Sequence, residues 1–323
     1  MSEVYHIPAM LKETIEGLAI KPDGVYVDVT FGGGGHSRAI LERMSAMKNG
    51  NPPKLADGKK GRLFSFDQDK DALQNAIEDE RWEFVHSNFR YLRNWMDFYG
   101  VTEIDGLLAD LGVSFHHFDC PERGFSFRFS APLDMRMNQT AKRTAADIVN
   151  GYSEEELAKI FWLYGELKNG RGLAKNICKA RAQKRIERTE ELVAAALKNT
   201  PKLTDTNEIE VPTNAKKDLA KLFQALRIEV NDEMGALREM LVAARDLLKP
   251  GGRIAILTYH SLEDRLVKNF LRSGNLEGTI EKDFYGNALT PFDVIEKGRE
   301  ASADEVERNP RARSAKLRVA EKK

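Results

Sequence analysis

Residues 25–37 read VYVDVTFGGGGHS, a short apolar run that enters four consecutive glycines and then a segment compatible with a helix. A strand that turns through glycines into a helix is how a parallel sheet builds a cradle for a nucleotide. Glycines permit positive φ and place no Cβ atoms in the way of a ligand, while free N–H groups at the helix start favour polar or anionic ligand groups. The stretch therefore predicts a nucleotide-type ligand at the end of the first strand.

The glycines do not fit the two best-known phosphate loops. A P-loop requires Gly-Lys-Ser/Thr, which is absent here. A dinucleotide fingerprint requires glycine at its first, third and sixth positions, and counting from Gly32 the sixth position is Ser37. ATP and NAD are therefore disfavoured. An NAD dehydrogenase remains the fold-level alternative, which titration with NADH would separate.

Two acidic residues follow apolar runs. Asp28 ends the first run, and Asp67 ends the next, which begins at Leu63. A carboxylate at such a position can accept both ribose hydroxyls of an adenosine ligand. The distance from the glycines to Asp67 exceeds the usual ~20 residues, because residues 49–61 insert a loop that we interpret as a surface elaboration.

Charge and length restrict the class of protein. The 323 residues predict about two domains, and 50 basic residues balance 50 acidic ones, so the whole molecule has no long-range field that would indicate a polyanionic partner. Two local basic clusters nevertheless suit phosphate contacts, although a basic helix face is more often merely solvated. One lies within residues 168–188, and the other contains Arg308, Arg311, Arg313, Lys316 and Arg318.

The two cysteines, Cys120 and Cys178, lie far apart without metal-ligand spacing, and no leader sequence or bilayer-spanning apolar run is apparent. We therefore expect a reducing cytoplasmic location and no membrane insertion. His116, His117 and Cys120 lack a fourth partner at suitable spacing, so no metal site is expected.

Short β-rich runs alternate with helical patterns along the chain and predict an α/β fold with a doubly wound, Rossmann-like parallel sheet. The predicted strands are residues 24–29, 62–66, 82–86, 105–111 and 253–259. About 140 residues separate the fourth from the fifth, far more than a crossover needs. Their patterns are helical, including a capping box at Ser153 to Glu156.

The predicted division is a main domain of residues 1–119 and 218–323 with an inserted helical domain of residues 120–217. Residues 316–320 are compatible with a final strand at the sheet edge. Residues 275–309 give no firm pattern.

Seven ordered motifs spread along the chain make it resemble the RsmH (MraW) family, the bacterial S-adenosylmethionine-dependent methyltransferases of the N4 amine of a cytidine in small-subunit (16S) ribosomal RNA. The motifs are TFGGGGHS at 30–37, DLGVS at 110–114, ERGFSF at 122–127, PLDMRM at 132–137, FQALRI at 223–228, HSLEDR at 260–265 and NPRARS at 309–314. The resemblance implies a class I methyltransferase sheet with an inserted helical substrate-binding domain, and S-adenosylmethionine as cofactor.

The resemblance also implies roles for individual residues. Gly34, Gly35 and His36 would line the methionine end of the cofactor, Asp67 would hold the ribose, Phe89 would pack on the adenine, and Asp110 would close the far side. His117 stands where the family usually has a glutamine that touches the cofactor, and Phe115 replaces a serine, so binding should survive with altered pH dependence. Departures after Tyr164 and in residues 216–221 fall in the predicted RNA-facing region.

Transfer of a methyl group to an exocyclic amine is an in-line displacement that depends on positioning. The amine needs an acceptor that localises its lone pair, and Asp110 or a carbonyl of the segment ending at Ser114 is placed for this. The base must leave its stack, at a cost of a few kcal/mol, which aromatic stacking could offset. Candidate substrate contacts are Phe115, Arg123, Phe125, Arg136, His260, Arg311 and Arg313.

Two further alternatives remain open from sequence. An amine methyltransferase acting on another nucleic acid would be separated by a test on duplex DNA. A ribosome-assembly binding protein without turnover is disfavoured by the presence of Asp67 and Asp110. The expected partner is 16S ribosomal RNA in the small ribosomal subunit, with both the assembled subunit and free RNA open as the substrate and with no protein partner evident.

Overall fold

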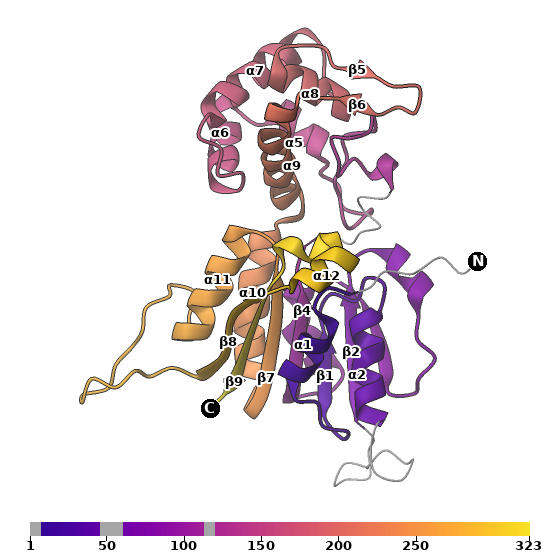
Figure 1. Ribbon diagram of the computed structural model, residues 1–323. Helices are drawn as coiled ribbons and strands as arrows, with labels where there is room; N and C mark the ends of the chain where they lie inside the picture. Colours follow the sequence, from indigo (N-terminus) through magenta and orange to yellow (C-terminus); the bar gives the residue numbers. More distant parts are fainter. Residues whose placement is uncertain (1–7, 46–60, 113–119) are drawn as a thin grey trace. The chain divides into compact units, whose positions relative to one another are not determined.

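The computed structural model describes residues 8–45, 61–112 and 120–323, and the chain divides into two compact units (Figure 1). Unit 1 comprises Met1–Gly112 and Met234–Lys323, and unit 2 comprises Val113–Glu233. Each unit has its own hydrophobic core.

Unit 1 is built on a seven-stranded sheet in the order β3-β2-β1-β4-β7-β9-β8. The strands are β1 (Val25–Asp28), β2 (Arg62–Asp67), β3 (Trp82–His86), β4 (Ile104–Asp110), β7 (Leu248–Thr258), β8 (Phe292–Glu300) and β9 (Lys316–Lys322). The first four and β7 run parallel, whereas β9 pairs antiparallel with both β7 and β8. The predicted doubly wound α/β sheet is confirmed, with an antiparallel edge.

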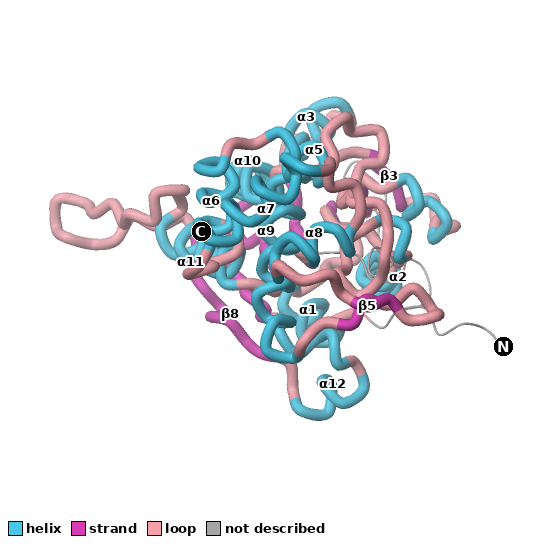
Figure 2. Tube along the Cα trace, turned by 90° about the horizontal axis from the view of Figure 1, so that it is seen from above, coloured by secondary structure: helices cyan, strands magenta, loops and turns pink. Residues whose placement is uncertain are grey.

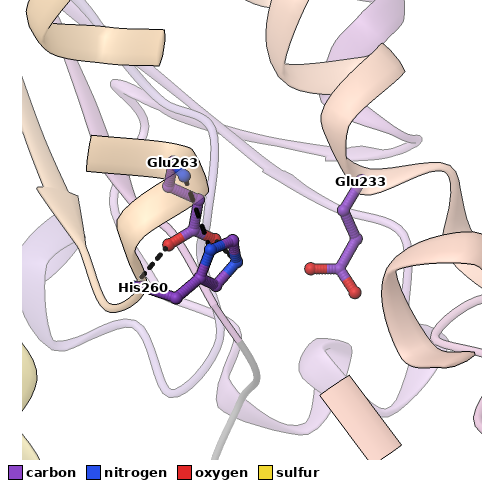
Figure 3. Close-up of side chains that lie close together, drawn as sticks. All are labelled: Glu233, His260 and Glu263. Carbon is purple, nitrogen blue, oxygen red and sulfur yellow. Dashed lines mark hydrogen bonds and ion pairs between the residues drawn. The ribbon is translucent and has the colours of Figure 1, made fainter. Parts of the chain in front are cut away.

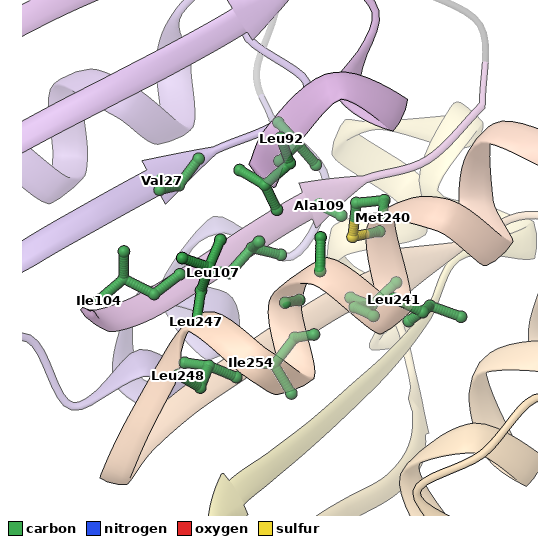
Figure 4. Packing of buried hydrophobic residues seen from close by; sticks show 14 of the residues in the cluster. Val27, Leu92, Ile104, Leu107, Ala109, Met240, Leu241, Leu247, Leu248 and Ile254 are labelled. Carbon is green, nitrogen blue, oxygen red and sulfur yellow. The ribbon is translucent and has the colours of Figure 1, made fainter. Parts of the chain in front are cut away.

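Alternating side chains of the strands bury both faces of this sheet. Val27, Phe64 and Leu107 point to one core, while their neighbours Tyr26 and Leu63 point to the other. Helices α3 (Leu92–Phe98), α10 (Glu233–Leu247) and α11 (Ser261–Ser273) complete the first core, part of which Figure 4 shows. Helices α1 (Leu11–Leu18) and α2 (Gly35–Ser45) complete the second. Burial on both faces explains why these strands read as continuous apolar runs.

Unit 2 is mainly helical. Its helices are α5 (Ala145–Gly151), α6 (Glu154–Leu163), α7 (Gly170–Gln183), α8 (Thr189–Leu197) and α9 (Lys216–Asn231), with a small hairpin of β5 (Lys202–Leu203) and β6 (Ile209–Glu210). The predicted capping box is present, because Ser153 and Glu156 cap the start of α6 reciprocally. The apolar stripe of α9, which includes Leu219, Leu222 and Leu226, is buried in the core of this unit.

The second boundary of the compact unit differs from the division expected from sequence. Helix α9 packs against α5 and α6, so the helical unit continues to Glu233 instead of ending at residue 217. The apolar face of α9 would suit either unit, and the sequence pattern alone does not say which core buries it.

The C-terminal segment contains more structure than its sequence pattern indicated. Strand β8 and helix α12 (Ala303–Arg308) both lie in residues 275–309. β9 is confirmed as a strand but is not at the edge, because β8 covers it. Side chains of β8 are mostly half-buried or exposed, which is typical of an edge strand and leaves little apolar signal. The connection from α11 to β8 extends away from the sheet (Figures 1 and 2).

Candidate active site

The glycine-rich turn after β1 is held from beneath by a buried carboxylate. Asp28 is fully buried, and its Oδ1 accepts a hydrogen bond of 3.0 Å from the backbone N–H of Thr30. Its Oδ2 accepts one of 2.6 Å from Ser37 Oγ, in the first turn of α2. Burial raises the pKa of Asp28, and the hydrogen bond from Ser37 opposes this rise. Asp28 therefore braces the turn from a fully buried position.

The turn itself requires glycine at two positions. Gly32 and Gly34 have φ of 50° and 75°, values that residues with a Cβ rarely adopt. A Cβ on Gly34 would also lie 2.9 Å from the ring of Phe31, whereas one on Gly32 would meet nothing nearer than 4.0 Å. The backbone at Gly32 is thus open to close approach by a ligand. Gly35 differs, because the space beside its Cα is filled by Pro8, whose Cγ would lie 2.2 Å from a Cβ.

Asp67, at the end of β2, links the neighbouring strand to the same turn. Its Oδ2 accepts a hydrogen bond of 2.9 Å from the N–H of Gly32, and its Oδ1 accepts one of 2.8 Å from the N–H of Asp69. The residue is half-buried. Its carboxylate thus stands at the carboxyl end of a parallel strand beside the glycine turn, which is where a ribose-binding acid lies in doubly wound sheets.

Asp110, at the end of β4, is the third acid at this edge of the sheet. Its backbone N–H donates a 2.6 Å hydrogen bond to Thr30 Oγ1, which fixes the strand end against the glycine turn. Its Oδ1 accepts a 2.6 Å hydrogen bond from the hydroxyl of Tyr259. Oδ2 lies 3.6 Å from Nδ1 of His36. Thr30, His36 and Tyr259 therefore meet at Asp110.

Burial raises the pKa of Asp110 to about 7, although the hydrogen bond from Tyr259 favours the charged form. The nearby charge of Glu263 raises it further. Burial and the neighbouring Asp110 raise the pKa of Tyr259 well above its usual value, so its hydroxyl keeps the proton that it donates. Asp110 is therefore a carboxyl group that is poised to ionise near neutral pH.

His36 lies in the first turn of α2 with its side chain 5% exposed. Burial lowers the pKa of this imidazole against the opposing pull of Asp28, so the ring is neutral. Its Nε2 is buried without a hydrogen-bond partner among the described residues. The backbone of Ala9 also acts on this ring and raises its pKa.

Phe89 begins the short helix η3 (Phe89–Tyr91) after β3 and is half-buried against the first core. The side chain packs on that core and keeps part of its surface accessible. This placement is compatible with the expected contact to an adenine ring.

His260 caps a helix. Its Nδ1 accepts from the N–H of Glu263 at 3.4 Å, the Glu263 carboxylate accepts from the backbone N–H groups of Tyr259 and His260, and α11 starts at the next residue. Figure 3 shows this reciprocal cap together with Glu233, which accepts hydrogen bonds from Arg227. His260 thus has a structural role as this cap, and its role as a substrate contact stays a prediction.

Three candidate substrate residues lie in unit 2. Phe125 is 4% exposed and belongs to the core of that unit, so the expectation that it offers a free stacking face is wrong. Arg123 donates to the carbonyls of Arg136 and Met137, which ties the segment together. Arg136 is bound to the carboxylate of Asp134 at 2.8 and 2.7 Å. All three therefore stabilise the entry to the helical unit.

The remaining candidates divide into two groups. Arg311 and Arg313 are exposed on helix η6 (Pro310–Ser314) of unit 1 and stay candidates for phosphate contacts. Ser114, Phe115 and His117 lie outside the described residues.

Sequence reasoning missed Tyr259 and Thr30, which hold Asp110 in place. Tyr259 is 149 residues from Asp110 in sequence. It is brought close because β4 and β7 are paired, with Asp110 opposite Leu257. The order of the strands in the sheet would have indicated that Tyr259 lies close to Asp110.

None of the helices in the described ranges is long and apolar enough to span a bilayer.

Known proteins match this chain over nearly its whole length. Residues 3–323 match the description of the MraW methylase family. The chain is 55% identical to the ribosomal RNA small subunit methyltransferase H of Bacteroides fragilis, over 99% of this chain and 98% of the relative. It is 56% identical to the protein of the same name from Parabacteroides distasonis, over 98% and 97%.

Proposed function

The chain belongs to the MraW methylase family, and from this premise we propose that it methylates the N4 amine of one cytidine in the 16S RNA of the small ribosomal subunit. The protein is a methyltransferase, and S-adenosylmethionine is its cofactor. The observation that carries the proposal is the placement of Asp110, held by Thr30 and Tyr259 beside the glycine turn.

The residues at this edge of the sheet fit the cofactor. When bound, S-adenosylmethionine supplies a methyl group on a cationic sulfur. The open backbone at Gly32 and the positive φ of Gly34 provide a turn that a ligand can approach closely. Asp67 would hold the ribose hydroxyls and Phe89 the adenine. His36, in the first turn of α2, would line the methionine end.

Asp110 would orient the acceptor. Tyr259 occupies Oδ1, which leaves Oδ2 to accept a hydrogen bond from the cytosine amine. Such a bond localises the nitrogen lone pair and holds it in line with the methyl group, so most of the rate enhancement would come from positioning. No covalent enzyme intermediate and no dedicated general base are required, because the methylated ammonium product is acidic and can lose its proton to solvent.

The helical unit is the proposed RNA-binding domain. A cytosine amine is accessible only when the base leaves its stack, which is least costly in an unpaired segment of RNA. Since the proposed substrate is ribosomal RNA, we place the reaction in the cytoplasm, on the small ribosomal subunit.

The proposal is tested by incubating the protein with S-adenosylmethionine and small subunits that lack this modification, followed by mass-spectrometric mapping of methylated cytidines. We expect N4-methylcytidine at a single site with the natural sequence and none with Asp110→Ala. Equal thermal midpoints of the two proteins are the control for folding, and calorimetry measures cofactor binding by the natural protein. Cofactor binding without any methylated cytidine would refute the proposed reaction.

A further inference from the structure

Helix α7 of unit 2 has one buried face and one strongly basic face. Gly170, Ala174 and Ile177 are buried against the rest of the unit. Arg171, Lys175 and Lys179 recur every four residues and are all exposed, so they share the opposite side of the helix. Lys168, also exposed, precedes the helix by two residues. We call these four residues the α7 basic face.

The α7 basic face lacks the pairing that neutralises neighbouring cations. Just beyond it, Lys184 is bound to Glu191 at 2.5 Å, and Arg185 lies 3.2 Å from Asp147. By contrast, none of the four residues of the face forms an ion pair or a side-chain hydrogen bond within the part of the chain that the structure describes. Their charges are therefore uncompensated.

The sequence of α7 accentuates this excess of positive charge. Residues 170–183, GRGLAKNICKARAQ, contain no acidic residue. The charges of Glu154 and Glu155, at the start of α6, act on Cys178 of this helix. In a protein with 50 basic and 50 acidic residues, such a stripe is a local feature that the net charge conceals.

We propose that the α7 basic face binds the phosphate backbone of the RNA substrate at a site separate from the residues that hold the reacting base. This inference rests on the proposed function, because it takes RNA as the substrate. Four residues of helix rise about 6 Å, so successive cations are spaced like neighbouring phosphates along a strand. Lysine and arginine that meet phosphates release condensed counterions, which provides affinity without reading sequence.

The spacing also favours RNA over an acidic protein as the partner. An acidic protein surface offers carboxylates in an irregular arrangement, whereas a nucleic-acid backbone offers anions at a regular interval to a regular stripe of cations. The paired residues Lys184 and Arg185 would contribute less, because binding a phosphate would first require them to leave Glu191 and Asp147.

The test compares two triple variants with the same change in net charge. Arg171→Gln/Lys175→Gln/Lys179→Gln removes three of the four cations of the α7 basic face, and Lys268→Gln/Lys282→Gln/Lys297→Gln removes three exposed lysines of unit 1. Binding to a full-length 16S RNA transcript is measured at several salt concentrations. Loss of three phosphate contacts should reduce the slope of log K against log salt by about 2 and weaken binding at low salt roughly tenfold or more. The control should change binding less than about twofold.

Further readouts separate this inference from the proposed function. Affinity for S-adenosylmethionine and the thermal midpoint should be unchanged in both variants, and Arg171→Lys/Lys175→Arg/Lys179→Arg should restore RNA binding. If the α7 variant keeps the natural salt slope, or loses affinity without a change in slope, the inference is overturned even though the enzyme methylates its substrate. If the natural protein binds RNA with the expected slope and the α7 variant lowers that slope, but no cytidine is methylated, the proposed function is wrong and the inference about the α7 basic face is supported.

Discussion

Replacing Tyr259 by phenylalanine should shift the pH dependence of methyl transfer without altering the fold. The Tyr259 hydroxyl donates a 2.6 Å hydrogen bond to Asp110, whose pKa is about 7 in its presence. A hydrogen bond to a charged group contributes about 1.5–3 kcal/mol, which corresponds to a rise of about 1–2 in the pKa of Asp110 when the bond is lost. The ionised fraction at pH 7 would fall from about one half to between about one tenth and one hundredth.

The expected consequence is a rate loss that depends on pH. If the carboxylate of Asp110 must accept a hydrogen bond from the substrate amine, kcat/KM for S-adenosylmethionine should fall about 5- to 50-fold at pH 7 and recover above about pH 9. Tyr99→Phe is the matched control, because it removes another tyrosine–carboxylate bond of unit 1, 3.1 Å long, to Glu83. Superimposable pH profiles for Tyr259→Phe and the natural protein would refute the reasoning.

Three further variants test the edge of the sheet. Asp67→Ala should weaken S-adenosylmethionine binding about 100-fold, as measured by calorimetry, since it removes charge-assisted hydrogen bonds to the ribose; unchanged affinity would exclude Asp67 from the site. Gly34→Ala should lower the free energy of unfolding by about 1–3 kcal/mol. This loss should exceed that of Gly100→Ala, because Gly100 has a similar φ of 66° but open space around it. Equal losses would show that the clash of the new Cβ with the Phe31 ring is unimportant. The pKa of Asp110 is raised, so its contribution to stability is present below about pH 4 and is lost as pH rises to about 7. Asp110→Asn should remove this dependence, of up to about 4 kcal/mol, in denaturant titrations at several pH values.

Sequence patterns predicted the parts of this fold that local chemistry determines. Five parallel strands and the capping box at Ser153 follow from periodicity and from side-chain hydrogen bonding over a few residues. Strand β8 was missed because an edge strand with mostly half-buried or exposed side chains has no apolar run. Phe125 was misjudged because an aromatic residue next to arginines reads equally well as a stacking surface or as core, and only the packing of unit 2 decides.

The residues of the site also divide into those that a local sequence pattern predicts and those that only the fold brings together. Asp67 and Asp110 could be proposed because ligands of doubly wound sheets bind at the carboxyl ends of the strands, where both residues lie. Their partners could not, since Tyr259 meets Asp110 through the pairing of β4 with β7, across 149 residues of sequence. Local patterns therefore identified the charged groups, whereas the groups that set their pKa values became apparent only with the strand order.

The poised state of Asp110 would make acceptor binding depend on the donor. With a pKa of about 7, the carboxyl group is only partly ionised by itself at neutral pH. A cationic sulfur nearby would lower this pKa, because an opposite charge favours the charged form of an acid. Asp110 would then accept the hydrogen bond from the amine most strongly while the donor is present. Once the positive charge was lost on transfer, the pKa of Asp110 would rise again and its hydrogen bond to the methylated base would weaken. Burial of this one carboxylate, moderated by Tyr259, would thus favour both productive binding and product release.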